Sequence, residues 1–150
     1  MVKKILPPTT KRVSYHSSPL LNSQIRNQTL AFLKTYQSAD KNILDDVLKK
    51  LDEEWDTERV LEANAAAAVV ISSILGLSTS KCWFFVSGTI GCFLLQHALQ
   101  GWCPPVPVIR KLGVRTAEEI SHQRIALKLL RGDFQHAFED PSDLLAIAEI

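Results

Sequence analysis

The chain has 150 residues, enough for one domain, and a formal net charge of +1 at pH 7. Nucleic-acid-binding proteins usually carry a clear basic excess, so this charge argues against nucleic acid as a partner. The mean hydropathy of +0.03 is typical of a soluble protein, but it averages an apolar middle and two charged flanks.

Residues 1–18 have basic side chains but no apolar core of ~7–15 residues after them, so no signal peptide is predicted. Pro7, Pro8 and scattered serines and threonines predict a disordered N-terminal tail over this range.

Residues 19–58 predict amphipathic cytoplasmic helices. A weak helix is expected over residues 20–36. Over residues 40–58, apolar side chains recur every three or four positions, which indicates a helix with one apolar face. Asp40 is suited to cap the start of that helix, and Asp56 the start of the next.

Residues 59–103 contain the apolar middle, with no charged side chain between Glu62 and Lys81 or between Lys81 and Arg110. Helices over residues 61–77 and 82–99 would each be roughly 25–27 Å long. That is slightly less than the ~30 Å hydrocarbon core of a bilayer, but within the accepted range for a span. The short connector, residues 78–81, requires an antiparallel pair. We therefore predict an all-α protein with a transmembrane helical hairpin and amphipathic flanking helices.

The alternative is a soluble helical bundle in which both apolar helices are buried. Neither apolar segment has the polar stripe that a helix face in water would need. In addition, Trp55, Trp83 and Trp102 lie at the ends of the segments. Indole rings favour the membrane–water boundary, so these residues are predicted interface anchors and the lipid bilayer is the predicted partner.

The distribution of basic residues predicts the orientation. The connector carries only Lys81, whereas the other ends of the spans are flanked by Lys49, Lys50, Arg59, Arg110, Lys111 and Arg115. The positive-inside rule then places both termini in the cytoplasm and the connector outside. The prediction is a multi-pass protein of the inner (plasma) membrane.

Small residues recur at helix-packing spacing in both spans. Ser72 and Gly76 are four positions apart in the first, and Ser87 and Gly91 in the second. Such pairs let helix backbones approach closely in lipid. They would serve either packing within the hairpin or formation of a homodimer.

Residues 104–150 predict a cytoplasmic proline-rich turn and C-terminal helices. Prolines after Cys103 must end the second span near Gly101. Thr116 and Glu119 match a capping box, and the helix that follows is expected to stop before Gly132. Asp140 and Pro141 would open a last short helix. The flanking helices could lie on the membrane surface or pack on one another.

Two runs carry a family resemblance: residues 95–105 (LQHALQGWCPP) and residues 112–120 (LGVRTAEEI). Together they resemble the YgaP-like bacterial transmembrane domain of unknown function. That family is a helical hairpin that ends in a Gly-aromatic-Cys-Pro element followed by a Leu-Gly turn, and some members are fused to a rhodanese (sulfurtransferase) domain. Residues 51–64 are similar to the entry of its first helix, and the resemblance covers roughly residues 50–134. This chain has no rhodanese domain, so sulfur transfer does not carry over.

Cys103 is the candidate thiol, because it follows the second span at the expected membrane boundary. It could carry a persulfide, form an intermolecular disulfide or bind a metal. A helix C-terminus is, however, the wrong pole to stabilise a thiolate, although Arg110 or Arg115 might compensate. The alternative is a structural turn residue. Cys82, Cys92 and Cys103 form no CxxC or zinc pattern, so no metal and no cofactor are predicted.

Four polar residues are candidate intramembrane contacts: His97, Asn64, Glu62 and Gln96. An ionisable residue inside a span is a functional hypothesis, but His97 could equally hydrogen-bond Gln96, Gln100 or Asn64 across the hairpin. Arg59 is spaced to pair with Glu62.

The sequence contains no Gly-rich phosphate loop, no serine-nucleophile elbow and no HExxH motif. We therefore expect no enzyme, but a membrane-anchored scaffold or interaction module. A thiol-based sulfur or redox accessory protein that uses Cys103 is the second hypothesis, and the soluble bundle the third.

Overall fold

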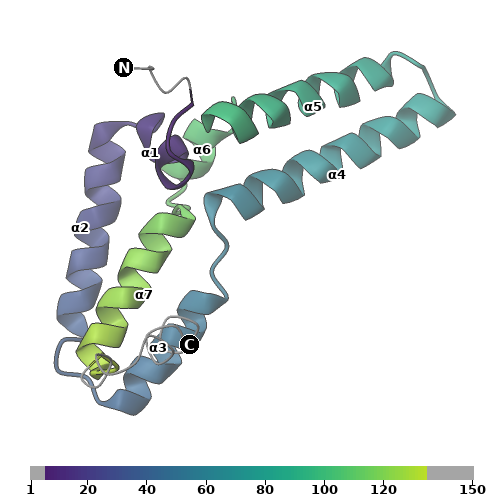
Figure 1. The fold of residues 1–150 in the computed structure, drawn as a ribbon. Helices are drawn as coiled ribbons and strands as arrows, with labels where there is room; N and C mark the ends of the chain where they lie inside the picture. Colours follow the sequence, from purple (N-terminus) through teal and green to yellow (C-terminus); the bar gives the residue numbers. More distant parts are fainter. Residues whose placement is uncertain (1–5, 135–150) are drawn as a thin grey trace, which may run out of the picture. The chain divides into compact units, whose positions relative to one another are not determined.

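A computed structural model describes residues 6–134, which divide into two compact units. The hairpin unit comprises residues 6–25 and 55–118, and the flanking unit comprises residues 26–54 and 119–134. All regular elements in these residues are helices, which confirms the all-α prediction (Figure 1). They are η1 (Thr9–Lys11), α1 (Arg12–Tyr15), α2 (Pro19–Thr35), α3 (Lys41–Asp52), α4 (Thr57–Ser78), α5 (Trp83–Gln100), α6 (Val106–Lys111) and α7 (Ala117–Arg131).

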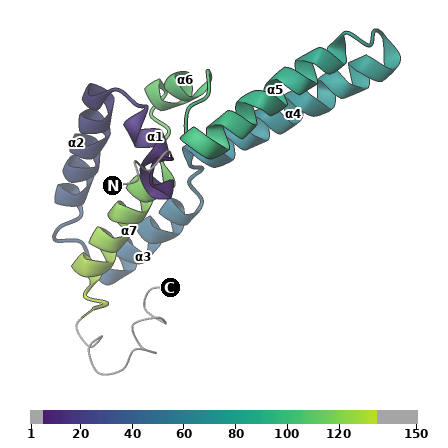
Figure 2. The ribbon, with the colours of Figure 1, turned by 45° about the horizontal axis from the view of Figure 1, so that its top comes forward.

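Helices α4 and α5 lie side by side and antiparallel, joined by a short turn (Figures 1 and 2). Asp56 caps α4, and its carboxylate accepts a hydrogen bond from the Arg59 N–H at 2.7 Å. This bond satisfies one of the free N–H groups of the first turn. At the same end of the pair, opposite the turn, α5 stops at Gly101, which adopts a left-handed conformation with φ of 78°.

The contact between α4 and α5 is built from small and polar side chains. The Ser72 and Ser87 hydroxyls are hydrogen-bonded at 2.7 Å, and Ser73 and Ser87 at 3.2 Å. Gly76 faces the Phe84 ring so closely that a Cβ there would lie 2.9 Å from it. Gly91 has open space beside its Cα, so of the two uses expected for the Ser87–Gly91 pair, the packing within the hairpin does not involve Gly91.

The large apolar side chains of the pair point outward. Leu77 is 83% exposed and Phe85 is 79% exposed, and the same surface includes Val70, Ile71, Ile74 and Leu95. In the part of the chain that the structure describes, one helical stretch, Lys41–Ser78, is long and apolar enough to cross a membrane. The apolar part of this stretch is α4, because α3 is rich in charged residues. Helix α5 does not meet the same criterion, since its last turns contain Gln96, His97 and Gln100.

The base of the hairpin packs against the segment that precedes α2. Val13 joins Leu61, Cys103, Val106 and Ile109 in one buried cluster. The predicted disordered tail over residues 1–18 is therefore wrong for residues 6–18, which form η1 and α1 and bury Val13. Residues 1–5 lie outside the described residues.

The flanking unit is built from the later part of α2 together with α3 and α7. Leu44, Leu48, Leu51, Ile120 and Leu127 form its buried cluster, on which Phe32, Leu33 and Tyr36 pack. Of the two arrangements expected for the flanking helices, the structure has the one in which they pack on each other.

The predicted helix boundaries differ modestly from those observed. The helix expected over residues 40–58 ends at Asp52, and Asp40 lies at its N-cap position without a side-chain capping bond. Helix α7 begins directly after Thr116 and stops before Gly132, whose φ is 89°. The last helix, expected at Asp140–Pro141, lies outside the described residues. The sequence predicted separate segments at 19–58, 59–103 and 104–150. In the structure, each of the two units combines residues from more than one of these segments.

Gly101 generates a stability prediction. A Cβ at this position would lie 2.4 Å from the Arg12 carbonyl carbon, whereas Gly113, with φ of 88°, has nothing within 4 Å. Gly113→Ala should cost only the left-handed backbone term, about 1–2 kcal/mol. Gly101→Ala adds a backbone clash and should cost about 2 kcal/mol more.

Denaturation of both variants in mild detergent, followed by circular dichroism, measures the difference. Equal losses of stability in Gly101→Ala and Gly113→Ala would contradict the close packing of α1 on the end of α5.

Candidate functional site

The end of the hairpin opposite the turn is held by Arg12. Its Nη2 donates to Glu58 Oε1 at 2.8 Å, and its Nη1 donates to the Ala98 carbonyl at 3.3 Å. The guanidinium therefore links the first turn of α4 to the last turn of α5. Both contacts are favourable for helix dipoles, because Glu58 lies near an N-terminus and the cation lies near a C-terminus.

Thr57 connects α4 to the segment that precedes α7. Its N–H and its hydroxyl both donate to the Arg115 carbonyl, at 2.8 and 2.9 Å. Thr57 is fully buried, so these bonds satisfy polar groups that water cannot reach.

His97 is 4% exposed and lies in the last turns of α5. Within residues 6–134, neither ring nitrogen has a hydrogen-bond partner. The predicted contacts with Asn64 or a neighbouring glutamine are not formed, because Asn64 Nδ2 donates instead to the Val60 carbonyl of its own helix at 2.7 Å. Glu62 and Asn64 are exposed and Gln96 is half-buried, so the four candidate polar residues do not form one cluster.

Arg59 makes a different contact from the one predicted. Its guanidinium lies over the Trp55 ring, with the guanidinium carbon 4.3 Å from the ring centre. Trp55 and Trp83 are both exposed, and Trp102 is half-buried. Trp55 and Trp102 flank the base of the hairpin, and Trp83 begins α5 beside the turn.

Cys103 is buried in the cluster at the hairpin base. Burial raises the pKa of its thiol, which favours the protonated, unreactive form. Cys82 and Cys92 are exposed. These surroundings are those of a structural turn residue, and they give the thiol hypothesis no support.

Arg110 is a buried residue that the sequence suggested as an orientation signal and as a cation near Cys103, but not as a structural hydrogen-bond donor. Its Nε donates to Ser17 Oγ at 3.2 Å, Nη1 to the Val114 carbonyl at 3.0 Å, and Nη2 to Asn22 Oδ1 at 3.0 Å. These bonds tie α6 to the start of α2. No local pattern in the sequence signals this role, because the partners Ser17 and Asn22 are about 90 residues away in the chain.

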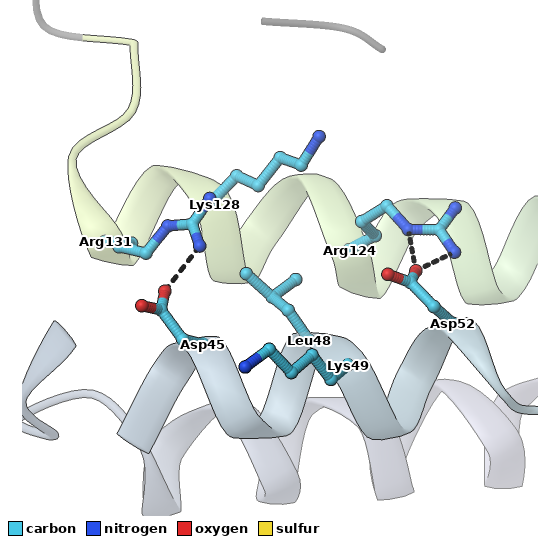
Figure 3. Close-up of a pocket in the computed structure, with 7 residues that line it drawn as sticks. All are labelled: Asp45, Leu48, Lys49, Asp52, Arg124, Lys128 and Arg131. Atoms are coloured by element: carbon cyan, nitrogen blue, oxygen red, sulfur yellow. Dashed lines mark hydrogen bonds and ion pairs between the residues drawn. The ribbon is translucent and has the colours of Figure 1, made fainter. Parts of the chain in front are cut away.

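The flanking unit has a charged groove between α3 and α7 (Figure 3). Arg131 Nη1 pairs with Asp45 at 2.5 Å, and Arg124 pairs with Asp52 through Nε at 2.9 Å. Arg131 also pairs with Asp133, and that hydrogen bond lowers the pKa of the Asp133 carboxyl. Because Arg124 and Arg131 both pair with carboxylates, these ion pairs hold α3 and α7 together along the groove.

The described residues contain no group of three or more His, Cys, Asp or Glu side chains that could hold a metal ion. The geometry of the hairpin base is that of a rigid corner that fixes the ends of two apolar helices.

Comparison with known proteins gives one family. The family model described as "Inner membrane protein YgaP-like, transmembrane domain" matches residues 56–119. The match begins at the N-cap of α4 and ends in the first turn of α7, so it includes the hairpin, the Trp-Cys-Pro-Pro corner and α6. Comparison with curated proteins and with solved structures gives no match. Residues 56–119 are therefore similar to the transmembrane domain of YgaP-like inner-membrane proteins, which is the family that the sequence resembles.

Proposed function

We propose that this protein is a non-enzymatic, multi-pass anchor of the inner membrane, in which both α4 and α5 cross the bilayer. The hairpin holds the flanking unit at the cytoplasmic face, where it serves as a scaffold or interaction module. The observation that carries the proposal is the polarity of the hairpin. Serine hydroxyls and glycine lie between the helices, and large apolar side chains lie outside.

This polarity suits lipid rather than water. A helix pair in water buries its apolar side chains and exposes its polar ones. In lipid, helix contacts use small residues and interhelical hydrogen bonds, because apolar side chains gain nothing by leaving the acyl chains. The Ser72–Ser87 bond and the close contact of Gly76 with Phe84 follow the second pattern.

The orientation rests on charge. Lys81 is the single basic residue in the turn, whereas Arg59, Arg110, Lys111 and Arg115 lie at the hairpin base. The proposal therefore puts the turn in the periplasm and the base, with both termini, in the cytoplasm. A homodimer through the outer surface of the hairpin stays a prediction.

An arginine at the centre of α4 tests the membrane anchor. Ile71 is exposed, so Ile71→Arg would be harmless in a soluble protein. In a transmembrane helix the substitution should cost about 2.5–3.5 kcal/mol of insertion free energy. We expect the variant to leave the membrane pellet or to be degraded.

Leu20→Arg is the matched control, because Leu20 is also more than half exposed but lies outside the hairpin. It should stay in the pellet. The proposed membrane anchor would be refuted if, without detergent, both the wild-type protein and a full yield of the Ile71→Arg protein were found in the high-speed supernatant.

Native Cys82 tests the orientation. It is exposed in the turn, and Cys92→Ser leaves it as the accessible thiol. A membrane-impermeant maleimide should label it in intact cells. A second variant carries Cys82→Ser, Cys92→Ser and Gln24→Cys. Its introduced thiol at position 24 should lie in the cytoplasm, so the maleimide should label it only after the cells are permeabilised. The reverse pattern would mean that the termini face the periplasm.

Cys103 separates the anchor from the thiol-based alternative. Its burial and raised pKa predict that, in the folded protein in detergent at pH 7, alkylation is at least about tenfold slower than at Cys82. The rate should rise when the protein is denatured. Rapid alkylation of native Cys103, or a persulfide on it in purified protein, would instead favour the sulfur or redox role.

A further inference from the structure

Helix α6 has one buried face and one exposed face. Its inner face is fixed, because Val106 and Ile109 belong to the buried cluster at the hairpin base. Its outer face is apolar and uncovered: Val108 is 58% exposed and Leu112, one turn later, is 78% exposed. Pro104 continues this line one turn earlier, and Lys111 lies at its edge. A surface in water would ordinarily be polar at such positions.

The location of α6 relates this face to the hairpin. Helix α6 begins a few residues after α5 ends, and Figure 2 draws it beside the base of the α4–α5 pair. The last turns of α5 expose Leu95 and Leu99. The half-buried Trp102 then leads into the exposed Pro104 and Val108. The apolar surface of the hairpin thus continues, through a tryptophan, onto α6.

Resting on the proposed membrane anchor, we propose that α6 lies on the cytoplasmic leaflet of the bilayer, with its outer face in the lipid. Val108 and Leu112 enter the boundary between headgroups and acyl chains, ~5–10 Å below the surface, as the apolar face of an interfacial helix does. Lys111 extends its ammonium to the lipid phosphates while its methylene stem stays against the apolar surface. The helix thereby fixes the depth at which the hairpin base sits.

The size of the face favours lipid over a protein partner. Helix α6 has six residues, and its exposed apolar line is a single row of side chains. A stable protein–protein contact needs roughly 800 Å² from each partner, more than such a row offers. A bilayer has no such requirement, because the hairpin already supplies the main attachment. The basic edge at Lys111 also matches anionic headgroups.

Depth-dependent quenching tests this placement. The full chain carries Cys82→Ser and Cys92→Ser, and Val108→Cys is labelled with an environment-sensitive fluorophore. Leu112→Cys is a second reporter on the same face, and Gln24→Cys, an exposed polar position of α2, is the water-facing control. A fourth chain, with Cys82→Ser only, places the label at native Cys92 on the outside of α5. All are reconstituted in vesicles of phosphatidylcholine and phosphatidylglycerol.

A lipid with a nitroxide near the headgroup should lower the fluorescence at Val108→Cys and Leu112→Cys by about twofold or more, as expected for a helix at this depth. Aqueous iodide should quench both at least about twofold less than Gln24→Cys, because water is excluded there. The Cys92 label should be protected from iodide and quenched best by a nitroxide deep in the acyl chain.

Three results would overturn the placement. If iodide quenches the α6 labels as strongly as Gln24→Cys while Cys92 stays in lipid, α6 faces water, although the anchor stands. If the α6 labels are shielded from both quenchers, a protein surface such as a second copy covers them. If Cys92 itself is open to iodide, the proposed anchor fails and the placement of α6 fails with it.

Discussion

Three chain segments meet at Arg12, and the rest of the hairpin unit depends on that meeting. Its backbone packs against Gly101, while its side chain joins Glu58 at the start of α4 to the Ala98 carbonyl at the end of α5. A side chain at Gly101 would occupy the space that the Arg12 backbone takes. A glycine at position 101 therefore has two roles. Its left-handed conformation ends α5, and its lack of a side chain leaves room for the backbone of α1. The buried cluster around Val13 and Cys103 assembles beside this contact.

The hairpin shows why hydropathy alone describes such a protein poorly. The contact between α4 and α5 is held by Ser72, Ser87 and Gly76, while the large apolar residues face outward. In water this distribution would leave the main driving force for folding unused. In lipid the outward side chains are solvated by acyl chains, and the short Ser72–Ser87 bond becomes a directional contact between helices. The same distribution of side chains therefore disfavours this helix pair in water and favours it in lipid.

Local signals in the sequence predicted the ends of the helices, because caps and prolines act over a few residues. Asp56 caps α4 and Gly101 ends α5, both as expected. The all-α class and the family also followed from local patterns. Contacts between residues far apart in the chain could not be predicted from these local patterns. The ordering of Arg12 and Val13 depends on Gly101 and Leu61, which are far away in the chain. Asn64 was expected to reach across the hairpin, and Gly91 to serve either the hairpin or a homodimer, because helix spacing leaves rotation about the helix axis undetermined.

The burial of His97 follows from the same geometry. It lies on the side of α5 that faces the hairpin base, close to the layer of charged groups formed by Arg12 and Glu58. A buried imidazole without a hydrogen bond is costly, so such residues are usually retained for a reason of packing or function. The described residues offer no group of three or more His, Cys, Asp or Glu side chains that could hold a metal ion, and burial raises the pKa of the Cys103 thiol. The packing role is thus the simpler account for this buried ring, which lies in the last turns of α5 near the residues that join the two helices.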